Sequence, residues 1–129
     1  MGDHELDVRP LRKPDKHWVL AFDGESLAGY TLYRISDDAL HMDEIQIASA
    51  YRGDGETFPL LMGKMLGDAR DARVTTLYSC ANKLNLKSQG ILNAMGLKVY
   101  GETERSFRCR GRAADAFFWH DNILRTSSH

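Results

Sequence analysis

The chain has 129 residues, 43% of them hydrophobic, which is enough for one hydrophobic core and too little for two, so we expect a single domain over residues 1–129. Its 17 Lys and Arg against 18 Asp and Glu give a net charge of −1, which argues against nucleic acid as the main partner. No long apolar run, no signal-peptide core and only two cysteines without metal spacing predict a cytoplasmic protein with no membrane partner and no metal site.

The first third of the chain has the pattern of an antiparallel meander. Residues 1–16 carry two prolines and many charges, which predicts an N-terminal arm or a short edge strand over 7–11. Apolar and β-branched runs at 18–22 and 27–35 flank an Asp-Gly pair, which is typical of a hairpin. A second turn precedes a third predicted strand over 40–47.

The rest of the chain alternates between helical and strand patterns. Thr57 can cap a helix whose apolar residues recur on one face, at 58, 61, 62, 65, 66 and 69. A strand over 74–79 precedes a second helix that ends at Gly96. The last strands are expected at 97–102, 105–110 and 116–120. This order predicts an α/β fold with a mixed central sheet and helices on its faces.

The most informative segment joins the third strand to the first helix. It reads Arg52-Gly53-Asp54-Gly55-Glu56-Thr57. A tight glycine turn before a helix directs free backbone N–H groups and the positive end of the helix dipole toward one spot. The ending Gly-Lys-Ser/Thr of a Walker loop is absent. The segment therefore indicates a seat for a pyrophosphate.

This loop resembles the acyl-CoA loop of the GNAT acetyltransferase superfamily, with the pattern Arg/Gln-x-x-Gly-x-Gly/Ala. A second segment, from Asn85 to Val99, resembles the family signature Asn-x-x-Ala-x-x-x-Tyr-x-x-x-Gly-Phe. The two segments lie in the family's order, about 30 residues apart, and the resemblance covers roughly residues 18–120. It implies a GNAT-like fold and an acyl-CoA-dependent N-acyltransferase.

The resemblance also implies acetyl-CoA as the co-substrate and indicates where it would bind. The third strand and the strand after the first helix are expected to splay apart, with pantetheine in the gap and its amides paired with the backbone of Ile45, Gln46 and Ile47. A backbone N–H near Ile47 would stabilise the oxyanion. The loop from Arg52 to Thr57 would hold the pyrophosphate, and Asn85 and Ser88 would add hydrogen bonds.

A general base is expected on the third strand. Side chains alternate along a strand, so His41, Asp43, Ile45 and Ile47 are predicted to share one face. In some relatives the base or its relay lies at the positions that His41 and Asp43 occupy, and an imidazole beside a carboxylate is a sensible pair. Glu44, on the opposite face, is the second choice. Capping of a strand end at the surface is the alternative role for His41 and Asp43.

Three features depart from the family pattern. Leu92 stands where a tyrosine often protonates the departing thiolate, which leaves Tyr100 or water as the acid. Asp54 and Glu56 place carboxylates near the predicted pyrophosphate, unless both point outward. The family's opening strand and two helices have little room before residue 18, so the acceptor face should be open, or covered by a homodimer or protein partner.

Two functions remain open from the sequence. The first is direct transfer of an acyl group from the CoA thioester to an amine, on a small molecule or a protein, within a ternary complex. The second is a degenerate GNAT-fold binding module that acts through protein–protein contact. Cys80, at the end of a predicted buried strand, is expected to be a small core residue rather than a nucleophile.

Overall fold

The computed structural model describes residues 6–13 and 16–124. Within them one mixed sheet has the strand order β1-β2-β3-β4-β5-β7-β6. The strands are β1 (Leu6–Lys13), β2 (Lys16–Asp23), β3 (Ser26–Ser36), β4 (Ala39–Ile47), β5 (Thr76–Asn82), β6 (Lys98–Glu102) and β7 (Ser106–Arg112). The helices are α1 (Thr57–Asp71), α2 (Leu86–Ala94) and α3 (Ala113–Trp119), with a 3₁₀ turn, η1 (Ser49–Tyr51), and a π-helical turn, η2 (His120–Leu124).

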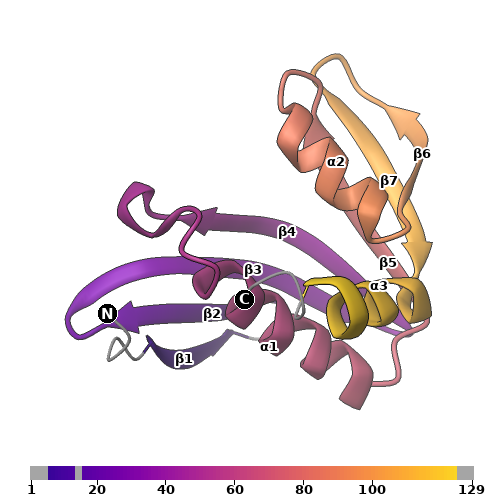
Figure 1. Cartoon of the computed structure of the whole chain (residues 1–129). Coiled ribbons are helices and arrows are strands. Elements are labelled where there is room, and N and C mark those ends of the chain that lie inside the picture. Colours follow the sequence, from indigo (N-terminus) through magenta and orange to yellow (C-terminus); the bar gives the residue numbers. More distant parts are fainter. Residues whose placement is uncertain (1–5, 14–15, 125–129) are drawn as a thin grey trace.

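The sheet consists of two antiparallel parts that diverge from a short parallel junction. Strands β1 to β4 form a meander, and β5, β7 and β6 form the second part. The junction is the parallel pairing of β4 with β5, which spans only 39–42 and 76–79. Beyond it the two parts open into a V, with α2 on the inner side of β5 and β7 (Figure 1).

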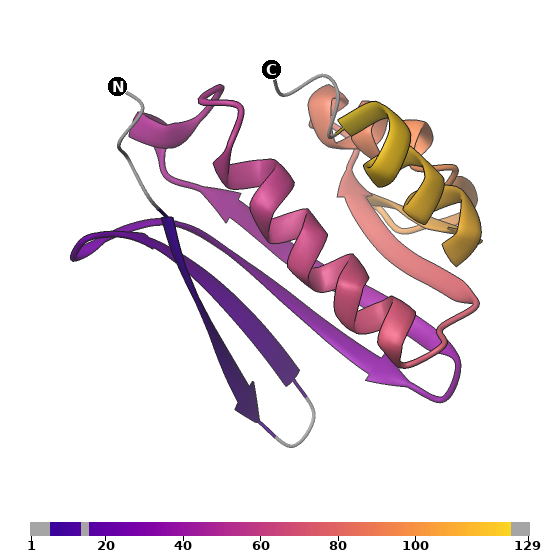
Figure 2. The same ribbon diagram turned by 60° about the horizontal axis from the view of Figure 1, so that its bottom comes forward.

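The core forms because α1 packs its apolar stripe on the meander. Leu61, Met62, Met65, Leu66 and Ala69 are all buried, as expected for residues spaced three and four apart. Figure 2 shows α1 running along β3 and β4 with α3 beside it. In the part of the chain that the structure describes, no helix covers the opposite face of β2, β3 and β4 (Figures 1 and 2).

A β-bulge in β4 changes which side chains share a face. Tyr33 pairs with Met42 and Leu32 pairs with Glu44, so Asp43 is the extra residue. As a result Met42, Ile45 and Ile47 pack toward the core, whereas Asp43 reaches Arg34 on the opposite face. The prediction that His41 and Asp43 share a face with Ile45 and Ile47 is therefore wrong, because strict alternation fails at a bulge.

Most predicted elements are confirmed, and one has the wrong type. The expected short edge strand is part of β1, which pairs with β2 along its length. The segment 116–120, predicted as a strand, lies in α3 and the start of η2. Ala113, Ala116 and Trp119 are buried at a spacing of three residues, so the apolar run packs as one face of a helix.

Candidate functional site

A cleft opens where β4 and β5 separate. The Oγ of Ser79 donates a hydrogen bond of 3.1 Å to the carbonyl of Met42, at the last paired residues of the two strands. Beyond this bond β4 and β5 form no ladder with each other. The backbone edge of β4 that faces β5 is thus available to an extended ligand from residue 43 onward. The predicted splaying of these two strands is confirmed.

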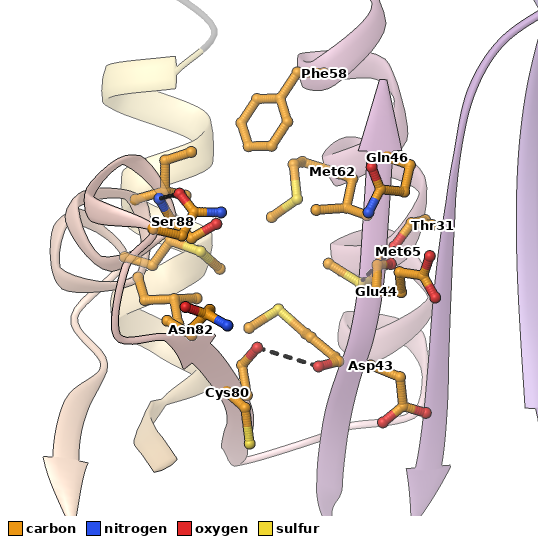
Figure 3. A pocket seen from close by; sticks show the side chains of 18 residues that line it. Thr31, Asp43, Glu44, Gln46, Phe58, Met62, Met65, Cys80, Asn82 and Ser88 are labelled. Atoms are coloured by element: carbon orange, nitrogen blue, oxygen red, sulfur yellow. Dashed lines mark hydrogen bonds between the residues drawn. The ribbon is translucent and has the colours of Figure 1, made fainter. Parts of the chain in front are cut away.

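Two cavities follow one another along this cleft. The inner cavity, about 240 Å³, lies beside the end of the strand junction, and the outer cavity, about 400 Å³, lies beside the glycine loop. They share six lining residues, namely Ile45, Gln46, Phe58, Asn85, Ser88 and Ile91. Figure 3 shows the two walls of the inner cavity, with Gln46, Glu44 and Asp43 along β4 opposite Ser88, Asn82 and Cys80. The cavities therefore form one elongated site.

The glycine loop at the outer end has the backbone that its sequence predicts. Gly53 and Gly55 have φ of +77° and +76°, which other residues adopt only at a cost. Both line the outer cavity together with Arg52. The Nε of Arg52 donates a 2.9 Å hydrogen bond to the carbonyl of Ile47, which ties the loop to the end of β4. The loop is thus held against the strand whose edge lines the cleft.

Asp54 points into the loop. Its Oδ1 accepts the backbone N–H of Glu56 at 2.9 Å and of Thr57 at 3.0 Å, and its Oδ2 accepts the Thr57 hydroxyl at 2.7 Å. The predicted cap by Thr57 is wrong, since Thr57 is the first helical residue and Glu56 is the N-cap residue. The carboxylate of Asp54 accepts the first N–H groups of α1 instead. The outward orientation considered for Asp54 is also wrong. Two of the N–H groups expected to bind an anion, those of Glu56 and Thr57, already hold a carboxylate.

The start of α2 forms the wall opposite β4. Asn85 is the N-cap residue, and its side-chain oxygen accepts the backbone N–H of Ser88 at 3.0 Å. Gly96, at φ +94°, follows the C-terminal end of α2, as predicted. Asn85 and Ser88 line both cavities. The structure thus brings these two predicted residues to the same cleft as Ile45, Gln46 and the glycine loop.

The two predicted catalytic residues lie close in the sheet but are not paired with each other. Asp43 lines the inner cavity and accepts two hydrogen bonds from Arg34, at 2.8 and 3.0 Å. This ion pair raises the pKa of Arg34. His41 stacks on Tyr78 with ring centroids 5.1 Å apart and does not line either cavity. The predicted His41–Asp43 pair is replaced by an Asp43–Arg34 pair.

Glu44 was predicted on the face opposite Asp43, but the bulge places it on the same wall as Asp43. It lines the inner cavity, and its carboxylate accepts a hydrogen bond from the hydroxyl of Tyr30. That hydrogen bond, together with burial, raises the pKa of Tyr30. The bulge thus places two consecutive carboxylates, Asp43 and Glu44, at the inner cavity.

Several lining residues were not identified from the sequence as part of a site. The inner cavity is lined by four methionines, Met42, Met62, Met65 and Met95. From the sequence, Met62 and Met65 were expected to be ordinary core residues of the first helix. Leu124 of η2 lines the outer cavity, although the C-terminal segment gave no signal of a site. Cys80 was expected in the core but is exposed and lines the inner cavity, since its side chain faces away from the helices.

Among residues 6–13 and 16–124, no group of three or more His, Cys, Asp or Glu side chains is arranged to hold a metal ion. No helix in the described part of the chain has the length and apolarity needed to cross a membrane.

No protein-family model and no curated protein matches the chain, but solved structures do. An N-acetyltransferase, PaiA, from Thermoplasma acidophilum in complex with coenzyme A matches with TM-score 0.67 at 13% identity over 76% of this chain, which spans 61% of that one. The Campylobacter jejuni N-acetyltransferase PseH in complex with acetyl coenzyme A matches with TM-score 0.63 at 19% identity, covering 78% of this chain and 70% of that one. A Bacillus subtilis acetyltransferase in complex with CoA matches with TM-score 0.66 at 10% identity, covering 84% and 99%.

These similarities cover between 76% and 84% of this chain. At such identities they establish the architecture, and three separately solved acetyltransferases share it. The chain therefore has the fold of the GNAT N-acetyltransferases.

Proposed function

We propose that the protein is an acyl-CoA-dependent N-acyltransferase that transfers an acyl group directly to an amine. The observation that carries this proposal is the continuity of the cleft from the glycine loop to the strand junction. A pyrophosphate at the loop would leave pantetheine to run between β4 and β5. Solved structures of this fold contain CoA or acetyl-CoA, which supports acetyl-CoA as a donor.

Different residues along the cleft would bind different parts of the CoA molecule. Arg52, the glycine loop and the start of α1 would bind the pyrophosphate. Asn85 and Ser88 would add hydrogen bonds from the opposite wall. The backbone edge of β4 at Ile45, Gln46 and Ile47 would pair with the pantetheine amides. Because Ile47 lines only the outer cavity, the N–H that stabilises the oxyanion is assigned closer to Ile45, which borders the inner cavity.

The reaction needs one base and no covalent enzyme intermediate. The amine nitrogen attacks the thioester carbonyl carbon, the C–S bond breaks, and the proton that the nitrogen then loses reaches the departing CoA thiolate through water. The ammonium form of the acceptor must first lose a proton. His41 and Asp43 are the proposed route for that proton, with a water molecule completing the path because His41 lies outside the cavity. Glu44, on the cavity wall, is the alternative base.

The acceptor would approach from the face that no described helix covers. Asp43 and Glu44 lie at that side of the cleft; Arg34 balances the charge of Asp43, so the charge of Glu44 is the one that favours a cationic amine. The acceptor is a small molecule or a protein, and a second copy or another protein is proposed to border this open face. The free thiols Cys80 and Cys109 fit a reducing compartment, and we propose the cytoplasm.

The experiment combines binding with turnover. Calorimetric titration of the purified protein with CoA and acetyl-CoA should give a 1:1 complex, and NMR should show perturbed amides in residues 45–57 and 85–88. Thiol release from acetyl-CoA with a panel of amines and peptides then tests transfer. Absence of CoA binding at millimolar concentration would overturn the proposal.

One observation favours a second function, a binding module without catalysis. Asp54 already occupies two N–H groups at the start of α1, those of Glu56 and Thr57, that a pyrophosphate would otherwise use. A protein that binds no CoA, or binds CoA tightly and acylates no acceptor, would support this reading. In the first case the open sheet face, rather than the cleft, would be the functional surface.

A further inference from the structure

We propose that the acyl group this site prefers is longer than acetyl, a saturated chain such as butyryl or hexanoyl. This inference rests on the proposed function and specifies which acyl-CoA thioesters the enzyme would use as donors. It follows from the inner cavity, which lies past the outer one along the path from the glycine loop and therefore receives the thioester end of a donor.

The helix side of the inner cavity is an apolar floor. Met62 and Met65 come from α1, Leu92 and Met95 from α2 and its C-cap, and each is at most 8% exposed. In Figure 3, Met62 and Met65 lie below Phe58 along α1, beside β4. An alkyl chain that contacts this floor would leave water for a hydrophobic environment, which favours longer chains.

The small polar groups at the floor already have hydrogen-bond partners. The hydroxyl of Ser79 donates to the carbonyl of Met42, and the hydroxyl of Thr31 donates to the carbonyl of Glu44 at 3.0 Å, with the sulfur of Met65 at 3.6 Å. A polar acyl terminus would therefore lose hydration without strong compensation. A hydrocarbon terminus has no such cost, so the floor selects by polarity as well as by size.

Methionine gives this floor the ability to adapt. Its unbranched thioether side chain has several rotatable bonds and fills irregular spaces. Leu92 adds no hydroxyl at the place where the family's tyrosine would put one near the sulfur. With Met42 completing a group of four methionines, the helix side of this 240 Å³ cavity offers an apolar surface to an alkyl chain, whereas Asp43 and Glu44 line its β4 side.

The test is the dependence of binding on chain length. Dissociation constants are measured by calorimetry for CoA, acetyl-, butyryl- and hexanoyl-CoA with the full chain. Each methylene that becomes buried should strengthen binding about fourfold. Affinity that is flat or falls from acetyl to hexanoyl would overturn the inference while leaving the proposed function intact. Failure of all four to bind would refute the proposed function itself.

Variants on α1 supply the matched comparison. Met62→Phe should shorten the pocket, so that hexanoyl-CoA loses its advantage while acetyl-CoA still binds. Leu66→Phe enlarges a buried residue of the same helix that lines neither cavity, and should keep the wild-type dependence. If both variants behave alike, the floor does not set chain length.

If circular dichroism shows that Met62→Phe does not fold properly, Met62→Ala is used instead. The smaller side chain enlarges the pocket, so the gain per methylene should extend to octanoyl-CoA in Met62→Ala more than in the wild type. No difference between Met62→Ala and the wild type would also overturn the inference.

Discussion

The carboxylate of Asp54 holds Thr57 by two hydrogen bonds, one to its backbone N–H at 3.0 Å and one to its hydroxyl at 2.7 Å. A third bond from the same carboxylate reaches the N–H of Glu56. The loop thus carries its own anion at the positive end of α1. A pyrophosphate would have to displace this carboxylate or bind beside it, against its charge.

Removal of that carboxylate should affect affinity and stability in opposite directions. Asp54→Ala frees two N–H groups and removes a like charge, so CoA should bind several-fold more tightly. The loss of the cap should lower the free energy of unfolding by about 1 kcal/mol. Calorimetry and urea unfolding measure the two effects. Asp71→Ala removes the same charge at the other end of α1 and should leave CoA affinity unchanged; weaker CoA binding in Asp54→Ala would contradict the account.

Two glycines should respond oppositely to alanine. An added Cβ at Gly53 meets nothing within 4 Å, so the cost of Gly53→Ala comes from its φ of +77° alone, about 1–2 kcal/mol. Gly67, inside α1, also has open space but ordinary helical φ, so Gly67→Ala should stabilise the protein by up to about 1 kcal/mol. Urea unfolding compares them. If the two variants changed the free energy of unfolding equally, the positive φ at Gly53 would not be the cause of the cost.

An ion pair between α1 and η2 should make stability depend on pH. Arg70 donates a 3.0 Å hydrogen bond to Asp121, and this bond, with a further one from His120, lowers the pKa of Asp121. A carboxyl whose pKa is lower in the folded chain stabilises the fold above its ordinary value of 3.8, and that contribution is lost as pH falls through the folded value.

Asp121→Asn measures this contribution. Because both side chains are partly exposed, the loss in unfolding free energy at neutral pH should be at most about 1 kcal/mol, and it should shrink to nothing in strong acid. Thermal or urea unfolding across the acid range gives the profile. Asp71→Asn is the same change at an exposed site on α1. A difference between Asp121→Asn and wild type that stays constant at every pH would refute the assignment.

The proposed base makes a kinetic prediction. His41→Ala should lower the rate of thiol release by about 10²–10⁴, because the ammonium acceptor keeps its proton. His41 stacks on Tyr78 at the sheet surface, so circular dichroism should show an intact fold. An unchanged rate in His41→Ala with a slow Glu44→Gln would make Glu44 the base.

Features with local causes could be predicted from the sequence. The glycines at 53, 55 and 96 adopt the positive φ for which glycine is the favoured residue, and Asn85 caps α2 through its own side chain. The stripe of α1 is buried as its spacing requires. Each of these depends on a few neighbouring residues, so a short window of sequence contains the information.

Features decided by distant partners could not be predicted. The sequence around Asp43 has no pattern that predicts a bulge, because the bulge depends on how β3 pairs with β4. As a result of the bulge, the side chain of Asp43 contacts Arg34. Residues 116–120 are apolar enough for a strand, but in the structure they belong to α3 and η2, whose buried face packs against β7 and α1. The methionines of α1 and α2 belong to core stripes in sequence, and only the divergence of β4 from β5 turns them into the lining of a cavity.

The bulge in β4 has a consequence for how this site could change. It directly follows Met42, the last residue that pairs with β5, and bulges bend and twist the strand that carries them. Deletion of Asp43 would leave every other β3–β4 pair in place and restore regular alternation. The opening of the cleft is thus tied to one surplus residue, so a single insertion or deletion, rather than a series of substitutions, is the shortest route by which this fold could gain or lose room for a ligand.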